Sequence, residues 1–159
     1  MAKQTRKPKV VLASGVFDLL HLGHVKFLED AKKAGGANAK LVVIVAKDST
    51  CEKLKGKKPI MSENQRRALV ESLRVVDEAV LGFEGLEIGE VIDKIKPDVI
   101  ALGWDQAGME AEVKGYVSRH KLPISVVRIG KFGEDTLDSS SKIKQKIIEA
   151  RQVTGKSHE

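Results

Sequence analysis

Short apolar segments rich in β-branched residues alternate along this chain with segments in which apolar residues recur at helical spacing. The apolar segments, which predict buried strands, lie at residues 10–13, 41–46, 79–81, 99–102 and 124–129. The helical segments are at 24–34, 62–73, 91–95 and 110–120, and a last helix is predicted after three serines at 139–141. This alternation is typical of an α/β fold in which a parallel sheet has helices on both faces. In such a sheet, ligands bind at the carboxyl ends of the strands.

Local signals indicate where these elements begin and end. Ser62 is a predicted helix N-cap with Gln65 in the capping-box position, and a second helix is predicted to end before Pro97. The stretch 47–61 is the longest irregular one and is rich in lysine, so we expect a mobile loop there. At 159 residues, the chain is expected to form one domain over residues 1–159, with a core at about 9–150 and flexible tails.

Composition narrows the partners of the chain. The formal net charge of +6 favours anionic ligands, whereas an aromatic content of 4% supplies few of the stacking surfaces that nucleic-acid binding uses. No apolar run approaches the roughly 20 residues that span a bilayer, and none has the length of a secretory signal. Because Cys51 is the only cysteine, an intramolecular disulfide or a cysteine-rich zinc site is excluded. These features predict a cytoplasmic protein, but the charge alone leaves open whether its partners are nucleic acid, a membrane surface or phosphorylated small molecules. Together with the motifs described next, we expect phosphorylated small molecules and neither nucleic acid nor membranes.

The segment between the first strand and the first helix carries the most specific pattern, Gly-x-Phe-Asp-x-x-His-x-Gly-His at residues 15–24. The N-terminus of a helix attracts phosphate, because its free amide groups and its dipole face the ligand. His21 and His24 are three residues apart, so both can reach one polyphosphate, and Gly23 allows the backbone to approach it closely. The alternatives are two surface or capping histidines, and a zinc site that would lack a nearby third ligand.

This pattern resembles the signature of the cytidylyltransferase-like nucleotidyltransferases. Further segments of the same family resemblance lie at residues 62–77, 103–106 and 139–143, in the family's order, so that the resemblance covers about residues 9–150. It implies a Rossmann-like domain and transfer of a nucleoside monophosphate from a triphosphate to a phosphate-bearing acceptor, without a covalent enzyme intermediate. The resemblance also implies Mg²⁺ carried by the triphosphate rather than by a metal site of the protein.

The resemblance assigns His21 and His24 to catalysis at the α-phosphorus. The nucleotide-binding residues that it implies are Gly15, Val16, Phe17, His21, Gly23, His24, Gly103, Trp104, Asp105, Ser139, Ser140 and Ser141.

Some of these assignments leave alternatives open. One of the serines can simply cap the last helix, which is compatible with phosphate binding, and Trp104 can belong to the core instead of the nucleotide site. The family's usual arginine-containing segment ahead of the serines is absent, so the cation for the distal phosphates is either Arg128 or Lys131.

Acceptor binding is assigned to Asp18, Lys55 and Arg66, and Lys57 is assigned a catalytic role in closing over the phosphates. For the two lysines and Arg66, the alternative is an ordinary solvated position.

Within the family, the loops most resemble those of archaeal FAD synthases, which implies ATP and FMN as substrates. The alternative acceptor is glycerol 3-phosphate with CTP; phosphopantetheine and heptose phosphates also remain open. An alternative of another class is a nucleotide- or RNA-binding module without turnover. The family resemblance also predicts a homodimer.

Overall fold

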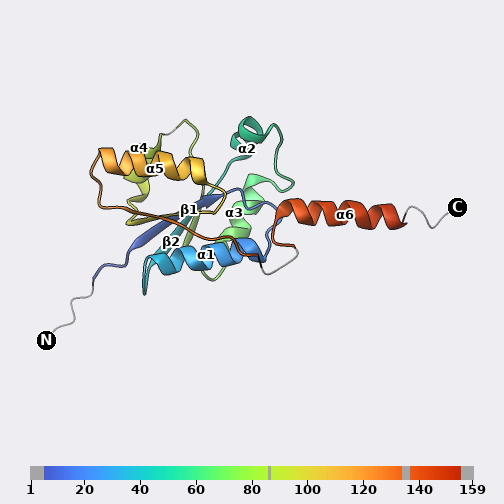
Figure 1. Ribbon diagram of the computed structural model, residues 1–159, viewed down its shortest axis with the longest axis horizontal. Helices are drawn as coiled ribbons and strands as arrows, with labels where there is room; N and C mark the ends of the chain where they lie inside the picture. Colours follow the sequence, from blue (N-terminus) through green and yellow to red (C-terminus); the bar gives the residue numbers. More distant parts are fainter. Residues whose placement is uncertain (1–5, 86, 134–136, 155–159) are drawn as a thin grey trace.

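The computed structural model describes residues 6–85, 87–133 and 137–154. Its five strands are β1 (Val10–Gly15), β2 (Lys40–Val45), β3 (Glu78–Leu81), β4 (Val99–Leu102) and β5 (Ser125–Arg128). They form one sheet in the order β3-β2-β1-β4-β5, and every neighbouring pair is parallel (Figure 1). Strand β1 therefore lies at the centre of the sheet, with two strands on either side of it.

The helices cover both faces of this sheet. Helices α1 (Leu22–Ala34) and α3 (Glu63–Glu71) pack on one face, while α4 (Ile88–Ile95) and α5 (Ala107–Arg119) pack on the other (Figure 1). The two remaining helices are α2 (Asp48–Lys55), at the carboxyl end of β2, and α6 (Ser140–Thr154), which projects away from the sheet. The predicted α/β class, with a parallel sheet between two layers of helices, is confirmed.

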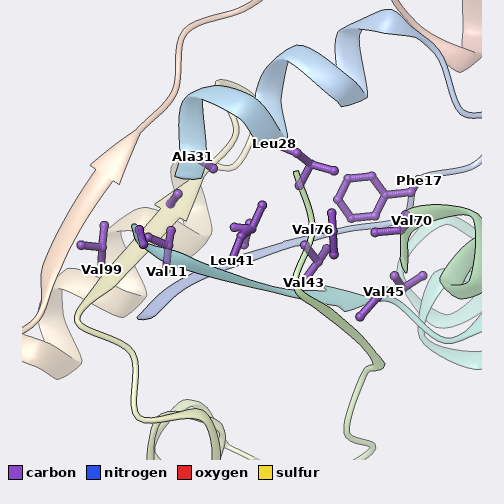
Figure 2. Close-up of a cluster of buried hydrophobic side chains, with 14 residues drawn as sticks. Val11, Phe17, Leu28, Ala31, Leu41, Val43, Val45, Val70, Val76 and Val99 are labelled. Atoms are coloured by element: carbon purple, nitrogen blue, oxygen red, sulfur yellow. The ribbon is translucent and has the colours of Figure 1, made fainter. Parts of the chain in front are cut away.

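The period of two in a strand explains how one sheet supplies two cores. Val11, Leu41 and Val43 point to the face that α1 and α3 cover, where Leu28 and Val70 pack against them (Figure 2). Alternate residues of β1 and β4 point to the opposite face; they include Leu12, Ile100 and Leu102, which pack with Ile92 of α4 and Val113 of α5.

Two predicted helix boundaries match the structure. The Ser62 hydroxyl oxygen accepts the backbone N–H of Gln65, so Ser62 caps α3 as expected. Helix α4 ends at Ile95, and Lys96 adopts a left-handed conformation with φ of 53° directly before Pro97.

The prediction of a loop over residues 47–61 is wrong in part, because α2 occupies its first half. This helix has an αL residue, Gly56, at its C-terminus and buries Cys51. Asp48, its first residue, is held by an ion pair from α3, a tertiary contact that periodicity does not reveal.

Candidate active site

The loop between β1 and α1 has an unusual backbone. Phe17 and Leu19 both have positive φ, 55° and 47°, which side-chain-bearing residues seldom adopt. The Phe17 ring is buried in the core between the sheet and the helices α1 and α3 (Figure 2). Burial of the ring stabilises a backbone conformation that is unfavourable by itself.

Asp18 ties this loop to the chain that precedes α3. Its carboxylate oxygens accept the backbone N–H groups of Ile60 and Met61, at 2.8 and 3.0 Å, and Lys144 of α6 lies 3.6 Å away. Burial alone raises the pKa of Asp18, but the two amides and the Lys144 ammonium outweigh burial and hold it below its ordinary value. Asp18 is thus an ionised junction of three segments, and its predicted contact with the acceptor stays a prediction.

Arg66 of α3 holds together the two loops that leave β1 and β2. Its guanidinium is fully buried and donates to the carbonyl oxygens of Val16 and Ala46, both at 2.7 Å, and to that of Met61 at 2.9 Å. A fourth bond runs to the Asp48 carboxylate at 2.6 Å.

These contacts correct the sequence-based assignment of Arg66. The alternative of a solvated position is wrong, because the side chain has no exposed surface. Arg66 also does not line the cleft described below, so its position does not favour the predicted contact with the acceptor. Its contacts instead fix the loops that leave β1 and β2.

His21 and His24 lie side by side at the start of α1. Their rings stack with centroids 3.8 Å apart, and Phe17 packs against the other side of the arrangement, 5.3 Å from the His24 ring. Nδ1 of His24 accepts the backbone N–H of His21 at 3.3 Å, so the remaining proton of a neutral His24 ring is on Nε2. Nδ1 of His21 is buried without a hydrogen-bond partner among the described residues.

Both imidazoles are neutral near pH 7 in the ligand-free protein. Burial lowers the pKa of His24 to about 4; the neighbouring His21 lowers it further, while Asp18 opposes the shift. Burial likewise lowers the pKa of His21, against the influence of Asp138. A polyphosphate would favour protonation of either ring, so the pair can supply N–H groups or positive charge when the negative ligand is present.

Gly23 is required by the way α1 meets the segment ahead of α6. A Cβ at this position would lie 2.8 Å from the carbonyl oxygen of Asp138 and 2.9 Å from the His21 ring. The absence of a side chain therefore brings the histidine pair against the segment that carries the serines.

The three serines start α6 beside the β1–α1 loop. The Ser139 hydroxyl oxygen accepts the backbone N–H of Lys142 and so caps the helix, which confirms capping by one serine. The Ser140 hydroxyl donates to the carbonyl oxygen of Asp18, which docks the helix end on the loop. Ser141 is exposed at the first turn. Two helix N-termini, those of α1 and α6, thus meet at one place, which favours an anionic ligand.

The turn after β4 forms the next part of the site. Gly103 donates its N–H to the Gln106 side chain at 2.7 Å, and a Cβ on Gly103 would approach the Asp105 carboxylate to 3.0 Å. Trp104 is half exposed, so the alternative of a core position is wrong. The Lys131 ammonium lies over its ring, 4.9 Å from the centroid, in a cation–π contact.

These elements surround one open cleft of about 1780 Å³ at the carboxyl ends of the strands. Every predicted site residue except Arg66 lines this cleft. These residues are Gly15, Val16, Phe17, Asp18, His21, Gly23, His24, Lys55, Lys57, Gly103, Trp104, Asp105, Ser139, Ser140 and Ser141. The two candidate phosphate cations differ in position, since Lys131 lines the cleft whereas Arg128 is ion-paired with Glu110 outside it.

Sequence reasoning predicted Lys55 in this cleft but missed the apolar residues that α2 and the β3–α4 loop contribute to it. Leu54 and Phe83 line it, although neither belongs to a motif. A leucine inside a lysine-rich stretch, at helical spacing from Cys51, was the available signal.

The described residues contain no group of three or more His, Cys, Asp or Glu side chains placed to share a metal ion. They also contain no helix that is long and apolar enough to cross a bilayer.

Comparison with known proteins places this geometry in a family. The family model described as cytidylyltransferase-like matches residues 12–146. The chain belongs to the cytidylyltransferase-like family. The predicted family membership and nucleotidyltransferase class are thereby confirmed.

Relatives of this cytidylyltransferase-like chain carry a common name. The FAD synthase of Thermoplasma volcanium is 47% identical, over 87% of this chain and 94% of the relative. That of Methanothermus fervidus is 47% identical over 86% and 92%, and that of Methanopyrus kandleri is 45% identical over 89% and 93%. These similarities agree with the subfamily that the loops predicted.

Two solved structures resemble this member of the family. A Thermoplasma volcanium protein described as a lipopolysaccharide core biosynthesis protein matches with a TM-score of 0.70 and 45% identity, over 79% of this chain and 98% of that one. Pantothenate synthetase from Thermus thermophilus matches with a TM-score of 0.58 and 16% identity, over 92% and 70%. The second likeness concerns the fold alone and agrees with the predicted Rossmann-like architecture.

Proposed function

We propose that this chain is an FAD synthase, which transfers the AMP moiety of ATP to FMN and releases pyrophosphate. The observation that carries the proposal is the convergence of the His21–His24 pair, the start of α6 and the turn after β4 on one cleft. The identity of the acceptor rests on the FAD synthases of several archaea, which are 43–47% identical to the chain over most of its length.

The strand order divides the cleft into two halves. The β4–α5 turn and Lys131, which follows β5, lie on one side of the central strand β1, while α2 and the β3–α4 loop lie on the other. We assign the β4–β5 half to the nucleotide, because Gly103, Trp104 and Asp105 stand there. The β2–β3 half is then left for the acceptor, so the two substrates meet at the histidine pair.

The reaction needs no covalent intermediate with the protein. A phosphate oxygen of FMN attacks the α-phosphorus of ATP, a new P–O bond forms, and the bond between the α-phosphorus and the bridging oxygen breaks as pyrophosphate leaves. Such a displacement depends on alignment and on stabilising the negative charge that spreads over the transferred group. His21 and His24 are the donors placed for that charge, since both rings line the cleft.

The distal phosphates are assigned to the start of α6 and to Lys131. Ser139 and Ser140 direct their side chains to the protein, so the free amides of the first turn and the Ser141 hydroxyl are the available donors. We prefer Lys131 to Arg128 as the cation, because only Lys131 lines the cleft.

Mg²⁺ fits this site as part of the substrate. Asp18 is engaged by two backbone amides and Asp138 by the Lys142 ammonium, so the carboxylates beside the serines already have partners. The ion would therefore be held by the triphosphate oxygens, where it neutralises the departing pyrophosphate.

On the acceptor side, Lys55 and Lys57 are the residues proposed to meet the FMN phosphate. No ion pair holds either ammonium within the described ranges of the chain. Lys57 lies just beyond Gly56, which ends α2. We propose that Lys57, which lines the cleft, contacts the attacking phosphate from this position.

The decisive experiment offers ATP or CTP, with Mg²⁺, to FMN or glycerol 3-phosphate and identifies the product by mass. We expect FAD from ATP and FMN, and a loss of at least about a hundredfold in kcat for His21→Ala and for His24→Ala. His120→Ala is the matched control, because His120 stacks on Tyr116 and does not line the cleft.

Other outcomes identify the alternatives. CDP-glycerol from CTP would keep the mechanism and replace both substrates. Nucleotide binding without any pyrophosphate release would instead indicate a binding module.

Three further features stay proposals. The chain is proposed to work as a single domain, in the cytoplasm and as a homodimer. Sedimentation equilibrium at several protein concentrations tests the dimer directly, since a monomeric mass throughout would contradict it.

A further inference from the structure

Helix α2 turns one side toward the acceptor half of the cleft. The residues of this helix that line the cleft are Thr50, Cys51, Leu54 and Lys55. Their spacing of three and four residues puts them on one face of the helix. The Cys51 side chain is the buried one of this helix. It anchors the face of α2 from which Leu54 and Lys55 extend.

Leu54 does not contribute to the core. Leu54 is 79% exposed. It is an apolar residue in a short helix and loop that otherwise carry several lysines. An exposed leucine adds little to stability, but it offers apolar contact to a ligand that enters the cleft.

The β3–α4 loop forms a second wall of this half. The Ser49 hydroxyl donates to the Glu84 carboxylate, which joins α2 to that loop. Phe83, next to Glu84, lines the cleft. The Lys94 ammonium lies over its ring, 5.4 Å from the centroid. The ends of β2 and β3 between the two walls bear the small residues Ala46 and Gly82, which also line the cleft.

We propose that Leu54 is a specificity-determining residue that packs against the isoalloxazine ring of the acceptor, while Lys57 holds the acceptor phosphate. The inference rests on the proposed FAD synthase function. FMN combines a flat, uncharged ring with a dianionic phosphate at the end of a flexible chain. The cleft offers the complementary pair on the acceptor side: an exposed aliphatic side chain and, beyond the end of the same helix, a lysine that has no ion pair among the described residues.

The test compares Leu54→Ser with Ile147→Ser. Ile147 of α6 is the matched control, because it is also an exposed aliphatic residue, at 60%, but does not line the cleft. We expect Leu54→Ser to raise the KM for FMN about tenfold with little change in the KM for ATP or in kcat, and Ile147→Ser to leave all three unchanged. Leu54→Met, which keeps an apolar side chain of similar size, should restore the KM for FMN.

Riboflavin separates the two ends of the acceptor, since it has the ring but lacks the phosphate. Its inhibition constant against FMN should rise in Leu54→Ser and stay unchanged in Lys57→Ala, whereas the KM for FMN should rise in both variants. If FAD forms but Leu54→Ser behaves like Ile147→Ser, the assignment of Leu54 is overturned and the proposed function stands. If the unsubstituted protein forms no FAD from ATP and FMN, the proposed function fails first and the assignment fails with it.

Discussion

His24 is subject to two opposing requirements. The ring is buried against His21 and Phe17, which favours the neutral form, and yet it lies where a highly charged ligand is expected. Its pKa of about 4 in the ligand-free protein shows that burial dominates until the ligand arrives. The free protein therefore keeps the ring uncharged, and nucleotide binding is coupled to the uptake of a proton wherever the pair becomes charged.

This burial makes stability depend on pH. The unfolded chain binds a proton at His24 below about pH 6.5, whereas the folded protein does so only near pH 4, so acid favours unfolding between these values. Lowering the pH from 7 to 5 should therefore cost about 2 kcal/mol through His24 alone. Urea unfolding at both pH values should show a smaller loss for His24→Asn than for the unsubstituted protein. Equal losses in the two proteins would contradict the buried neutral ring.

Gly23→Ala tests the contact between α1 and the segment before α6. The new Cβ would meet a backbone carbonyl, that of Asp138, at 2.8 Å, and backbone cannot yield as a flexible side chain can. We expect a destabilisation of about 1–3 kcal/mol and a fall in kcat of more than about tenfold, because His21 is displaced. Gly108→Ala is a suitable control, since a Cβ there meets no atom within 4 Å.

At the scale of elements, α3 controls loops that lie far from it in the sequence. Arg66 binds the carbonyl groups that follow β1 and β2 and also the first residue of α2. The resemblance located Arg66 but not this function, because its acceptors are backbone oxygens up to 50 residues away. The same contact explains why α2 was not predicted, since a tertiary ion pair stabilises a lysine-rich segment that has weak periodicity.

Arg66→Lys should be strongly destabilising. Lysine keeps the charge but cannot make the four directed hydrogen bonds, so buried carbonyls and the Asp48 carboxylate lose partners. We expect a loss of about 3–5 kcal/mol in the free energy of unfolding. The adjacent Arg67→Lys should change it by less than about 1 kcal/mol, because Arg67 forms a partly exposed pair with Glu71. Similar losses for the two variants in urea would rule out the special role of Arg66.

At the scale of the whole molecule, sequence periodicity was sufficient to predict the sheet and the helix layers on its two faces. All five strands and the helices α1, α3, α4, α5 and α6 lie where apolar spacing and end signals predicted, within a few residues. The motif residues also gather in one cleft, because parallel strands bring their carboxyl ends to one edge. What periodicity could not supply was the contribution of residues outside motifs, such as Leu54, whose role depends on which loops face each other.

The net charge of +6 leads to a prediction about salt. The proposed phosphate site has a small number of cations, so the affinity for ATP should fall by less than about tenfold between 50 and 200 mM salt. A protein that contacts 6–10 phosphates of a nucleic acid loses about 10³–10⁵ in affinity over the same range. Calorimetric titrations with ATP and with an RNA duplex measure both dependences. Tight RNA binding with the steeper dependence would favour the RNA-binding alternative.

The central place of β1 has a consequence for how new enzymes of this kind arise. Because the proposed nucleotide half follows β4 and β5 while α2 follows β2, the two halves are encoded by separate stretches of the chain. Exchange of residues 47–61 for the matching stretch of a relative with another acceptor, with the Arg66 anchor and Asp48 retained, should redirect the enzyme to that acceptor and preserve its use of ATP. The proposed division thus puts the nucleotide half and the acceptor half on stretches of the chain that can change independently.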